Sequence, residues 1–311
     1  MSRPNQPRRI PHSIPKAAKI SPTTVSTSRL PVVANLARER GHQVIGIDRR
    51  KDTGGNQLVV SDVTDRDHML SLSENCDAII HCAAIVGPAP ATADPAIATH
   101  VNVNGTLSVL EAARKHTARI VCLSTATLYG NDPALPTNDE SAEPNPVGIY
   151  DATKLMAETL CDAYRKAFAI SVASIRTSFV YGPGHSTGEY FVKRCLEGEI
   201  AITGSGRDHP CEFTYVKDLA NGLVAAAEAP AFSFPVYNIA SGLCRTRGEL
   251  ANIVMSHFPG VSIDLEPGLE PGRHLRGPCL IKRAHDDFHY SPRYGLERGI
   301  EDWLKQSRET K

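Results

Sequence analysis

Residues 32–48, VVANLARERGHQVIGID, contain the pattern that decides the fold. The first ten place apolar residues at helical spacing and end on Gly41, a residue type that commonly terminates helices. His42–Asp48 is then a short β-branched run that ends in an acid. A helix that leads directly into a buried strand is part of a βαβ unit, the building block of parallel sheets.

The alternation of helices and strands continues up to about residue 180. Apolar runs of strand length are separated by segments of ten or more residues with helical spacing. The predicted strands are residues 57–62, 77–84, 119–124 and 170–176, and the predicted helices are residues 101–116 and 150–166. This order predicts an α/β fold with a Rossmann-like, doubly wound parallel sheet. Right-handed crossovers then place ligands at the carboxyl ends of the strands.

Length and composition divide the chain into three regions. At 311 residues it exceeds the usual size of a single core, so a second lobe is expected. We expect residues 31–180 to form the Rossmann domain. Residues 181–311, where Gly and Pro become frequent, are expected to form mostly a smaller C-terminal substrate-binding lobe. Residues 1–30 are expected to be a disordered or atypical N-terminal segment.

The N-terminal segment differs from the rest in its chemistry. No Asp or Glu precedes Glu39, and residues 1–30 contain six basic residues and five prolines. Proline prevents a long helix, so the segment lacks the amphipathic pattern of a mitochondrial targeting peptide, although its basic, acid-free composition fits one. We expect a basic tail. The alternatives are a targeting segment and a wrongly assigned start of the chain.

Charge and cysteine use exclude several classes of protein. The 34 basic and 34 acidic residues balance, which gives no support for binding nucleic acid or a membrane surface. No apolar run approaches the roughly 18 residues that span a bilayer. The eight cysteines form no CxxC pair, and no Cys/His spacing suits zinc. We therefore expect reduced core thiols, no metal site and a cytoplasmic location.

Tyr150 and Lys154 lie four residues apart on a predicted helix, so their side chains share one face. An ammonium near a phenol favours the phenolate and lowers the pKa of the phenol from about 10 toward neutrality. A phenolate at the carboxyl edge of the sheet can accept the proton of a secondary alcohol. Ser124 and Thr125 end a predicted strand and can place a hydroxyl beside it; alternatively, they only close a turn.

Ten short segments follow one another in the order typical of one enzyme family. They are VIGID, SDVTD, IIHCAA, VNVNGT, LSTATLYG, YDATK, SIRTSFVYGPG, FTYVKDLANG, VYNIASG and YSPRYGLERGIEDWL. The chain resembles the NAD-dependent epimerase/dehydratase family, the extended branch of the short-chain dehydrogenases/reductases, over about residues 32–305. The resemblance implies an oxidoreductase or isomerase of carbohydrate metabolism whose Rossmann domain, residues 31–180, binds NAD or NADP.

The resemblance also assigns roles to individual residues. Tyr150 resembles the general acid/base, Lys154 its partner that also binds the nicotinamide ribose, and Thr125 the catalytic Ser/Thr. Asp48 resembles the acid that binds the adenosine ribose, which favours NAD over NADP, although neighbouring arginines could tolerate a 2′-phosphate. The other cofactor-binding candidates are Asp62 and Val63 beside the adenine, Ala83 and Ala84 beneath the cofactor, Asn102 as a brace for the catalytic helix, and Ser124.

The phosphate-binding turn departs from the family pattern. Its three glycines should stand at positions 23, 26 and 29, where this chain has Thr23, Ser26 and Arg29. Side chains there would crowd the pyrophosphate, which needs bare backbone N–H groups at a helix start. The Pro-rich residues before Pro31 also lack a convincing first strand.

The substrate side departs from the pattern at two positions. Phe179 and Cys211 stand where nucleotide-sugar members have an Asn and a diphosphate-binding Arg. Losing a bidentate phosphate partner is costly, so both changes weaken the case for a nucleotide-sugar substrate. Arg207 or Arg273 could substitute for the missing Arg.

We expect an NAD-dependent oxidoreductase or epimerase that acts on a secondary alcohol of a sugar or sugar-acid substrate through Tyr150, Lys154 and Thr125. The alternative is a catalytically impaired Rossmann-fold binding protein that lacks the glycine-rich phosphate turn. The expected partner is a small molecule, with no nucleic acid and no membrane. The family's usual assembly further predicts a homodimer that packs the helices at 101–116 and 150–166, and two-fold symmetry is the commonest in homo-oligomers.

Overall fold

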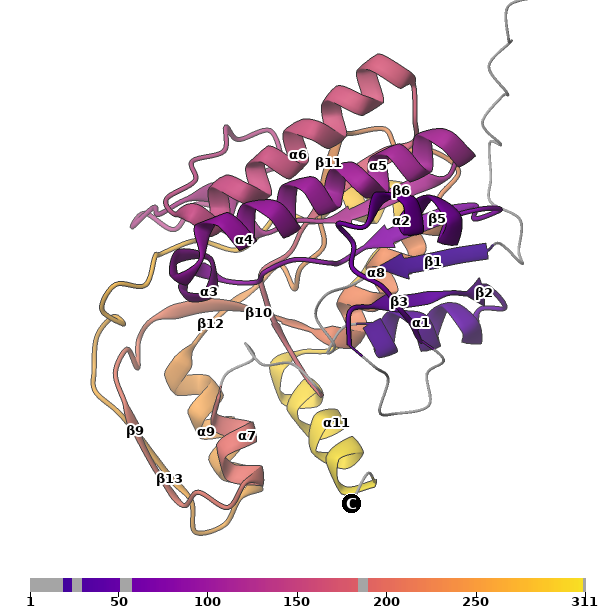
Figure 1. Ribbon diagram of the computed structural model, residues 1–311. Helices are drawn as coiled ribbons and strands as arrows, with labels where there is room; N and C mark the ends of the chain where they lie inside the picture. Colours follow the sequence, from indigo (N-terminus) through magenta and orange to yellow (C-terminus); the bar gives the residue numbers. More distant parts are fainter. Residues whose placement is uncertain (1–18, 24–29, 51–57, 184–189, 310–311) are drawn as a thin grey trace, which may run out of the picture.

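The computed structural model describes residues 19–23, 30–50, 58–183 and 190–309. Its largest sheet is parallel, with strands in the order β11-β7-β6-β5-β1-β3-β4 and β2 paired to β1 (Figure 1). The strands are β1 (Lys19–Thr23), β2 (Gln43–Val44), β3 (Gly46–Asp48), β4 (Leu58–Val60), β5 (Ala78–His81), β6 (Arg119–Leu123), β7 (Val172–Arg176) and β11 (Val236–Asn238). The strand order reverses between β1 and β5, where such sheets bind ligands. The Rossmann-like fold is confirmed.

The middle strands β5, β6 and β7 are buried along their whole length. Continuous burial is expected where helices cover both faces of a parallel sheet. Helices α2 (Arg66–Leu72), α5 (Gly105–His116) and α6 (Ile149–Phe168) lie on one face (Figure 1). On the other face, α1 (Leu30–Glu39) packs on α8 (Val216–Glu228), which also contacts α10 (Lys282–Phe288). Short helices α3 (Pro88–Ala93) and α4 (Pro95–Thr99) lie ahead of α5.

Strand β1 occupies the centre of the sheet, in a stretch where the sequence predicted no convincing strand. Its backbone pairs with β5 from Ile20 to Thr23, and Thr23 also pairs with Ile47 of β3. Pro22 hides this strand from sequence patterns, because proline cannot donate to a sheet ladder and is rare in central strands. Residues 19–23 therefore belong to the Rossmann sheet rather than to a separate N-terminal segment.

The C-terminal lobe holds two small sheets that the sequence analysis did not predict. One has the order β12-β10-β8 and the other pairs β13 with β9. Their strands are β8 (Phe179–Tyr181), β9 (Ala201–Gly204), β10 (Pro210–Tyr215), β12 (Cys244–Thr246) and β13 (Ser262–Leu265), and the lobe helices are α7 (Tyr190–Leu196), α9 (Arg247–His257) and α11 (Leu296–Glu309). Since α8 and β11 return to the large sheet, the expected boundary at residue 180 does not divide the chain cleanly.

A buried ion pair ties α6 to β7. Arg176 donates from Nε and Nη2 to the two carboxylate oxygens of Glu158, at 3.0 and 2.8 Å. Both side chains are buried, and the Tyr129 ring lies 4.8 Å from the guanidinium carbon. Because α6 carries Tyr150 and Lys154, this pair fixes the helix that presents both residues at the carboxyl edge of the sheet.

Replacing Glu158 with Ala should lower the free energy of unfolding by about 3–5 kcal/mol, because the Arg176 guanidinium would stay buried without its counter-charge. The matched control on the same helix is Asp162→Ala, which removes partly exposed pairs with Arg165 and Lys166 and should cost less than about 1 kcal/mol. Chemical denaturation measures both values. Equal losses would show that the buried pair contributes no more than a surface pair.

Candidate active site

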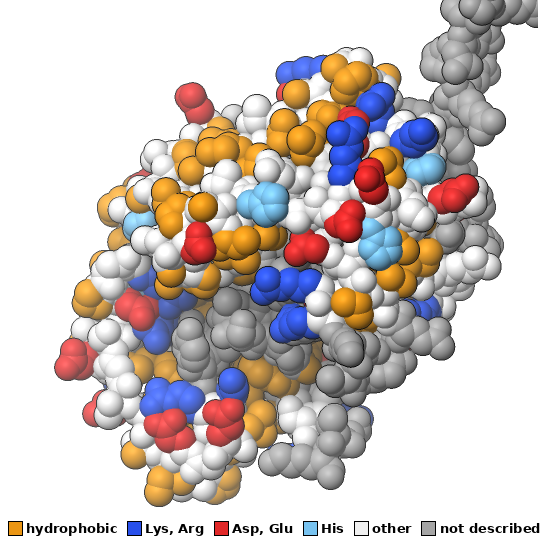
Figure 2. Space-filling view, in the orientation of Figure 1, with side chains coloured by type: hydrophobic (Ala, Val, Ile, Leu, Met, Phe, Trp, Pro, Cys, Tyr) orange, Lys and Arg blue, Asp and Glu red, His pale blue; other side chains and the backbone are white. Residues whose placement is uncertain are grey.

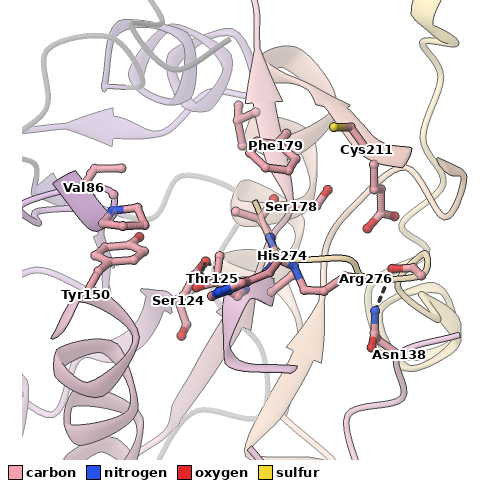
Figure 3. Close-up of a pocket in the computed structure, with 18 of the residues that line it drawn as sticks. Val86, Ser124, Thr125, Asn138, Tyr150, Ser178, Phe179, Cys211, His274 and Arg276 are labelled. Carbon is pink, nitrogen blue, oxygen red and sulfur yellow. Dashed lines mark hydrogen bonds between the residues drawn. The ribbon is translucent and has the colours of Figure 1, made fainter. Parts of the chain in front are cut away.

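A cavity of about 160 Å³ lies at the carboxyl edge of the large sheet (Figure 3). The segments that follow β5, β6 and β7 line it together with the first turn of α6, and the C-terminal lobe supplies the remaining wall. In Figure 3 Tyr150 lies on one side, Cys211 and Arg276 lie on the other, and Ser124 and Thr125 lie between them. The cavity therefore combines the predicted catalytic residues with side chains from the lobe.

Tyr150 and Lys154 occupy successive turns of α6 and are 7% and 3% exposed. Tyr150 lines the cavity, and Lys154 Nζ donates to the Leu123 carbonyl at the end of β6, at 2.7 Å. The field of this buried ammonium reaches His81. Burial first, and the Lys154 charge second, lower the pKa of His81 from 6.5 to about 3. His81 is therefore neutral at physiological pH.

A chain of hydroxyls joins the strand end at Thr125 to the start of α6. Thr127 Oγ1 donates to Asp151 at 2.5 Å, and the Thr125 and Thr127 hydroxyl oxygens are 3.0 Å apart. Since the Thr127 proton points to Asp151, Thr125 must be the donor to Thr127, which leaves a lone pair on Thr125 for a ligand hydroxyl. Asp151 also accepts from the Val147 and Gly148 amides at the helix start. Sequence reasoning missed Thr127 and Asp151, although both lie inside quoted motifs.

Two further hydroxyls in the cavity wall have no hydrogen-bond partner. Ser124 and Thr177 follow β6 and β7 and are each 4% exposed. Among the described residues nothing bonds to Ser124 Oγ or Thr177 Oγ1. Buried polar atoms are normally hydrogen-bonded, so both positions favour a bound polar ligand.

Asp48 lies at the carboxyl end of β3 and is fully buried. Its Oδ1 accepts from the Arg50 amide at 3.0 Å, whereas Oδ2 has no partner among the described residues. A carboxylate oxygen without a partner among the described residues, at the carboxyl end of β3, suits the hydroxyls of an adenosine ribose. The Arg50 guanidinium lies 3.6 Å from Oδ1, so a basic group is also present.

The remaining cofactor-binding candidates differ in their surroundings. Asn102 accepts from the Ile85 amide at 2.7 Å and donates to Thr153 of α6 at 2.9 Å. It thus connects the loop after β5 to α6. Asn102 belongs to η1 (His100–Asn104), a π-helical turn ahead of α5. Ala83, Ala84 and Val63 are buried, whereas Asp62 is exposed and its carboxylate accepts from Thr64.

The phosphate turn lies largely outside the described residues. Ser26 and Arg29 fall in the connection between β1 and α1, and Thr23 is the last residue of β1. The chain has no glycine before Gly41, so the connection is glycine-free in any alignment.

The lobe side of the cavity is apolar near Phe179 and Cys211. The guanidinium of Arg273, a suggested phosphate partner, lies 4.3 Å from the centre of the Phe179 ring. Arg273 also pairs with Glu270 at 2.6 Å, and Arg247 pairs with the other oxygen of Glu270 at 2.6 Å. Arg207, the second suggested partner, is exposed and outside the cavity wall.

Glu212 and Arg276 also line the cavity, and sequence reasoning singled out neither. The Glu212 carboxylate accepts from the Gly242 amide at 2.7 Å and from the Cys279 amide at 3.2 Å. Burial raises the pKa of Glu212 to about 7 against the smaller effect of these hydrogen bonds. The sequence signal was weak, because both partners belong to loops distant in the chain.

The described residues contain no metal cluster, no disulfide bond and no membrane-spanning helix. No group of three or more His, Cys, Asp or Glu side chains is placed to hold a metal ion. None of the eight cysteines, which all lie in the described ranges, forms a disulfide bond, and seven of them are buried. No helix in the described ranges is long and apolar enough to cross a membrane.

Comparison with known proteins decides the family. The pattern of the NAD dependent epimerase/dehydratase family matches residues 32–240. The chain belongs to this family. The match includes the segments that carry Asp48, Thr125, Tyr150 and Lys154, so the resemblance seen in the sequence is confirmed.

Several proteins with named activities are similar in sequence or structure to this chain. The dTDP-L-rhamnose 4-epimerase of Burkholderia thailandensis is 25% identical over 82% of this chain and 83% of the relative. UDP-glucuronic acid decarboxylase 1 of Danio rerio is 30% identical over 72% of this chain, which spans about half, 55%, of that relative's length. The solved structure of MoeE5 in complex with UDP-glucuronic acid and NAD has a TM-score of 0.82 at 22% identity, covering 94% of this chain and 99% of that one. This likeness shows the shared fold.

Glu212 should make the stability of this family member depend on pH. Between pH 4.5 and 7 the folded protein keeps a proton on Glu212 that the unfolded chain has released, so stability falls as the pH rises through this window. The rise in the pKa of Glu212 from 4.5 to about 7 corresponds to a loss of about 3 kcal/mol in the free energy of unfolding across this window. The Glu212→Gln protein should lack this part of the pH dependence. Relative to wild type, its free energy of unfolding should therefore be more favourable at pH 8 than at pH 5.

Chemical denaturation at pH 5 and pH 8 measures the effect. The matched control is Glu143→Gln, an exposed carboxyl that should leave the pH profile unchanged. Parallel pH profiles for wild type and Glu212→Gln would contradict the assignment of a raised pKa to Glu212.

Proposed function

We propose that this chain is an NAD-dependent oxidoreductase or epimerase that acts on a secondary alcohol of a sugar or sugar acid, with Tyr150 as the general base. The observation that supports this function is the placement of Tyr150 in the cavity wall with the buried Lys154 one helical turn away. Its named relatives are a dTDP-L-rhamnose 4-epimerase and a UDP-glucuronic acid decarboxylase, both enzymes of sugar derivatives.

The proposed chemistry begins with a proton transfer. Tyr150, as phenolate, accepts the hydroxyl proton of the substrate, and the Lys154 charge stabilises the phenolate in a site of low dielectric. The free lone pair of Thr125 accepts a hydrogen bond from a second, neighbouring hydroxyl of the substrate, which orients the reacting hydroxyl toward Tyr150. NAD, when bound, supplies the nicotinamide that takes up the hydride. A dehydrogenase then releases the ketone, whereas an epimerase reduces it again on the opposite face.

Tyr150→Phe should abolish turnover and leave the affinity for NAD nearly unchanged, because the change removes only the oxygen that accepts the proton. The matched control is Tyr164→Phe on the same helix, where the hydroxyl bonds to Glu111 away from the cavity and its loss should leave turnover intact. A screen of sugars and sugar acids that follows reduced nicotinamide and product epimers measures both. Substantial turnover by the Tyr150→Phe protein would contradict the assigned base.

Asp48 supports NAD as the cofactor, since its unpaired carboxylate oxygen suits ribose hydroxyls and repels a 2′-phosphate. We therefore expect NAD to bind more tightly than NADP in a calorimetric titration, and Asp48→Asn to reduce that preference. Equal affinity for the two cofactors would mean that the neighbouring arginines dominate the site.

The same titration tests the alternative function. A chain without glycine before Gly41 lacks the bare backbone that usually holds the pyrophosphate, and this observation favours an impaired binding protein. Absence of NAD binding together with absence of turnover would support that alternative. Tight NAD binding by the unmodified chain would exclude it and show that the phosphates are held in another way.

We also propose a homodimer that packs α5 and α6 of two subunits together. Figure 2 shows hydrophobic side chains over the part of the surface where these helices lie. Leu107 of α5 and Met156 and Phe168 of α6 are exposed. A self-complementary apolar face suits two-fold symmetry, and light scattering at micromolar concentration tests it.

A further inference from the structure

Arg276 stands out among the charged groups of the cavity wall. Its side chain lines the cavity opposite Tyr150 (Figure 3), and Nη1 donates one long hydrogen bond of 3.3 Å to the Gly130 carbonyl. It forms no ion pair with any residue in the described ranges. A guanidinium carries five N–H donors, so most of its bonding capacity faces the cavity unused.

The nearby acids and bases are engaged elsewhere. Asp151 is the acid whose charge acts on Arg276, but its carboxylate already accepts from Thr127 and from the start of α6. The Glu212 carboxylate accepts from two backbone amides. Arg273 is held in an ion pair with Glu270, which it shares with Arg247. Arg276 is thus a half-buried cation with no ion-pair partner among the described residues, and its free N–H groups are available to an anionic ligand.

The size of the site favours one compact anion. A single guanidinium matches a carboxylate in a planar, bidentate arrangement, whereas a diphosphate would call on further arginines or lysines, and Arg276 is the only such residue among the described residues of the cavity wall. A sugar acid that contacts both Arg276 and Tyr150 spans the cavity, because these residues line opposite sides of it (Figure 3).

The unpartnered hydroxyls of Ser124 and Thr177 form an independent sign of a polar ligand in the same cavity. Both are more than nine-tenths buried and can bond to hydroxyl groups between the two ends of such a molecule. A polyhydroxylated acid satisfies the cation and the hydroxyls together.

We propose that Arg276 binds a carboxylate of the substrate, so that the substrate is a sugar acid whose reacting secondary alcohol lies at Tyr150. This proposal rests on the proposed function and narrows its substrate class. Arg276 is then the residue that selects acids over neutral sugars.

Binding of matched pairs to the NAD-loaded protein tests the proposal. The probes are glucuronate with glucose, galacturonate with galactose, UDP-glucuronate with UDP-glucose, and glucose 6-phosphate, each measured by calorimetry. Wild type should bind the acid of at least one pair 10-fold or more tighter than its neutral partner. Arg276→Met should weaken the affinity for the acid by about 10- to 100-fold, the range for hydrogen bonds to charged groups. The affinity for the neutral sugar should stay unchanged.

Two variants guard the interpretation. Arg276→Lys keeps the charge but loses the planar fork, and should bind the acid with intermediate affinity; it replaces Arg276→Met if that protein does not fold. Arg273→Met removes a neighbouring charge that is held in an ion pair with Glu270, and should leave the acid preference intact. An equal loss in Arg273→Met would overturn direct binding by Arg276.

Other outcomes also decide the matter. No preference for an acid in any pair, or tighter binding of glucose 6-phosphate than of every acid, overturns the proposal. Failure of the proposed function has a different signature, because wild type would then lack turnover even where the acid binds in an Arg276-dependent manner.

Discussion

The hydrogen bond from Lys154 to the Leu123 carbonyl joins the catalytic helix to the carboxyl end of β6. Leu123 is the last residue of that strand, and the next two residues, Ser124 and Thr125, enter the cavity wall. Tyr150 is one turn of α6 from Lys154. The bond from Lys154 therefore holds the start of α6 against the end of β6. A buried ammonium needs an acceptor, and the strand provides it where the chain leaves the sheet. The arrangement of base and hydroxyls depends on this bond.

Long, uniform elements could be predicted from the sequence because local pattern and burial agree in them. β5, β6 and β7 are mostly apolar runs in the sequence and are buried along their length in the structure. The pair Tyr150 and Lys154 could be found because helical spacing alone places two residues on one face. In these cases the information lies within a few neighbouring positions.

The parts that sequence analysis missed depend on contacts between distant segments. β1 contains Pro22 and is a strand only because β5 and β3 flank it. The strands of the lobe are short and border Gly- and Pro-rich loops. Arg276 donates a hydrogen bond to Gly130, almost 150 positions earlier in the chain. Glu212 accepts hydrogen bonds from Gly242 and Cys279, which are also distant in sequence. No periodic pattern records such long-range partners.

The π-helical turn η1 has a consequence for how this chain tolerates change in length. Such a turn holds one residue more than an α-helical turn, and here it carries Asn102 between the loop after β5 and Thr153. One residue of an α-helix corresponds to a rotation of about 100°. Removing a single residue from η1 would restore a regular helix and swing Asn102 away from both partners. A deletion that leaves every cavity residue in place would thus uncouple the loop from the catalytic helix.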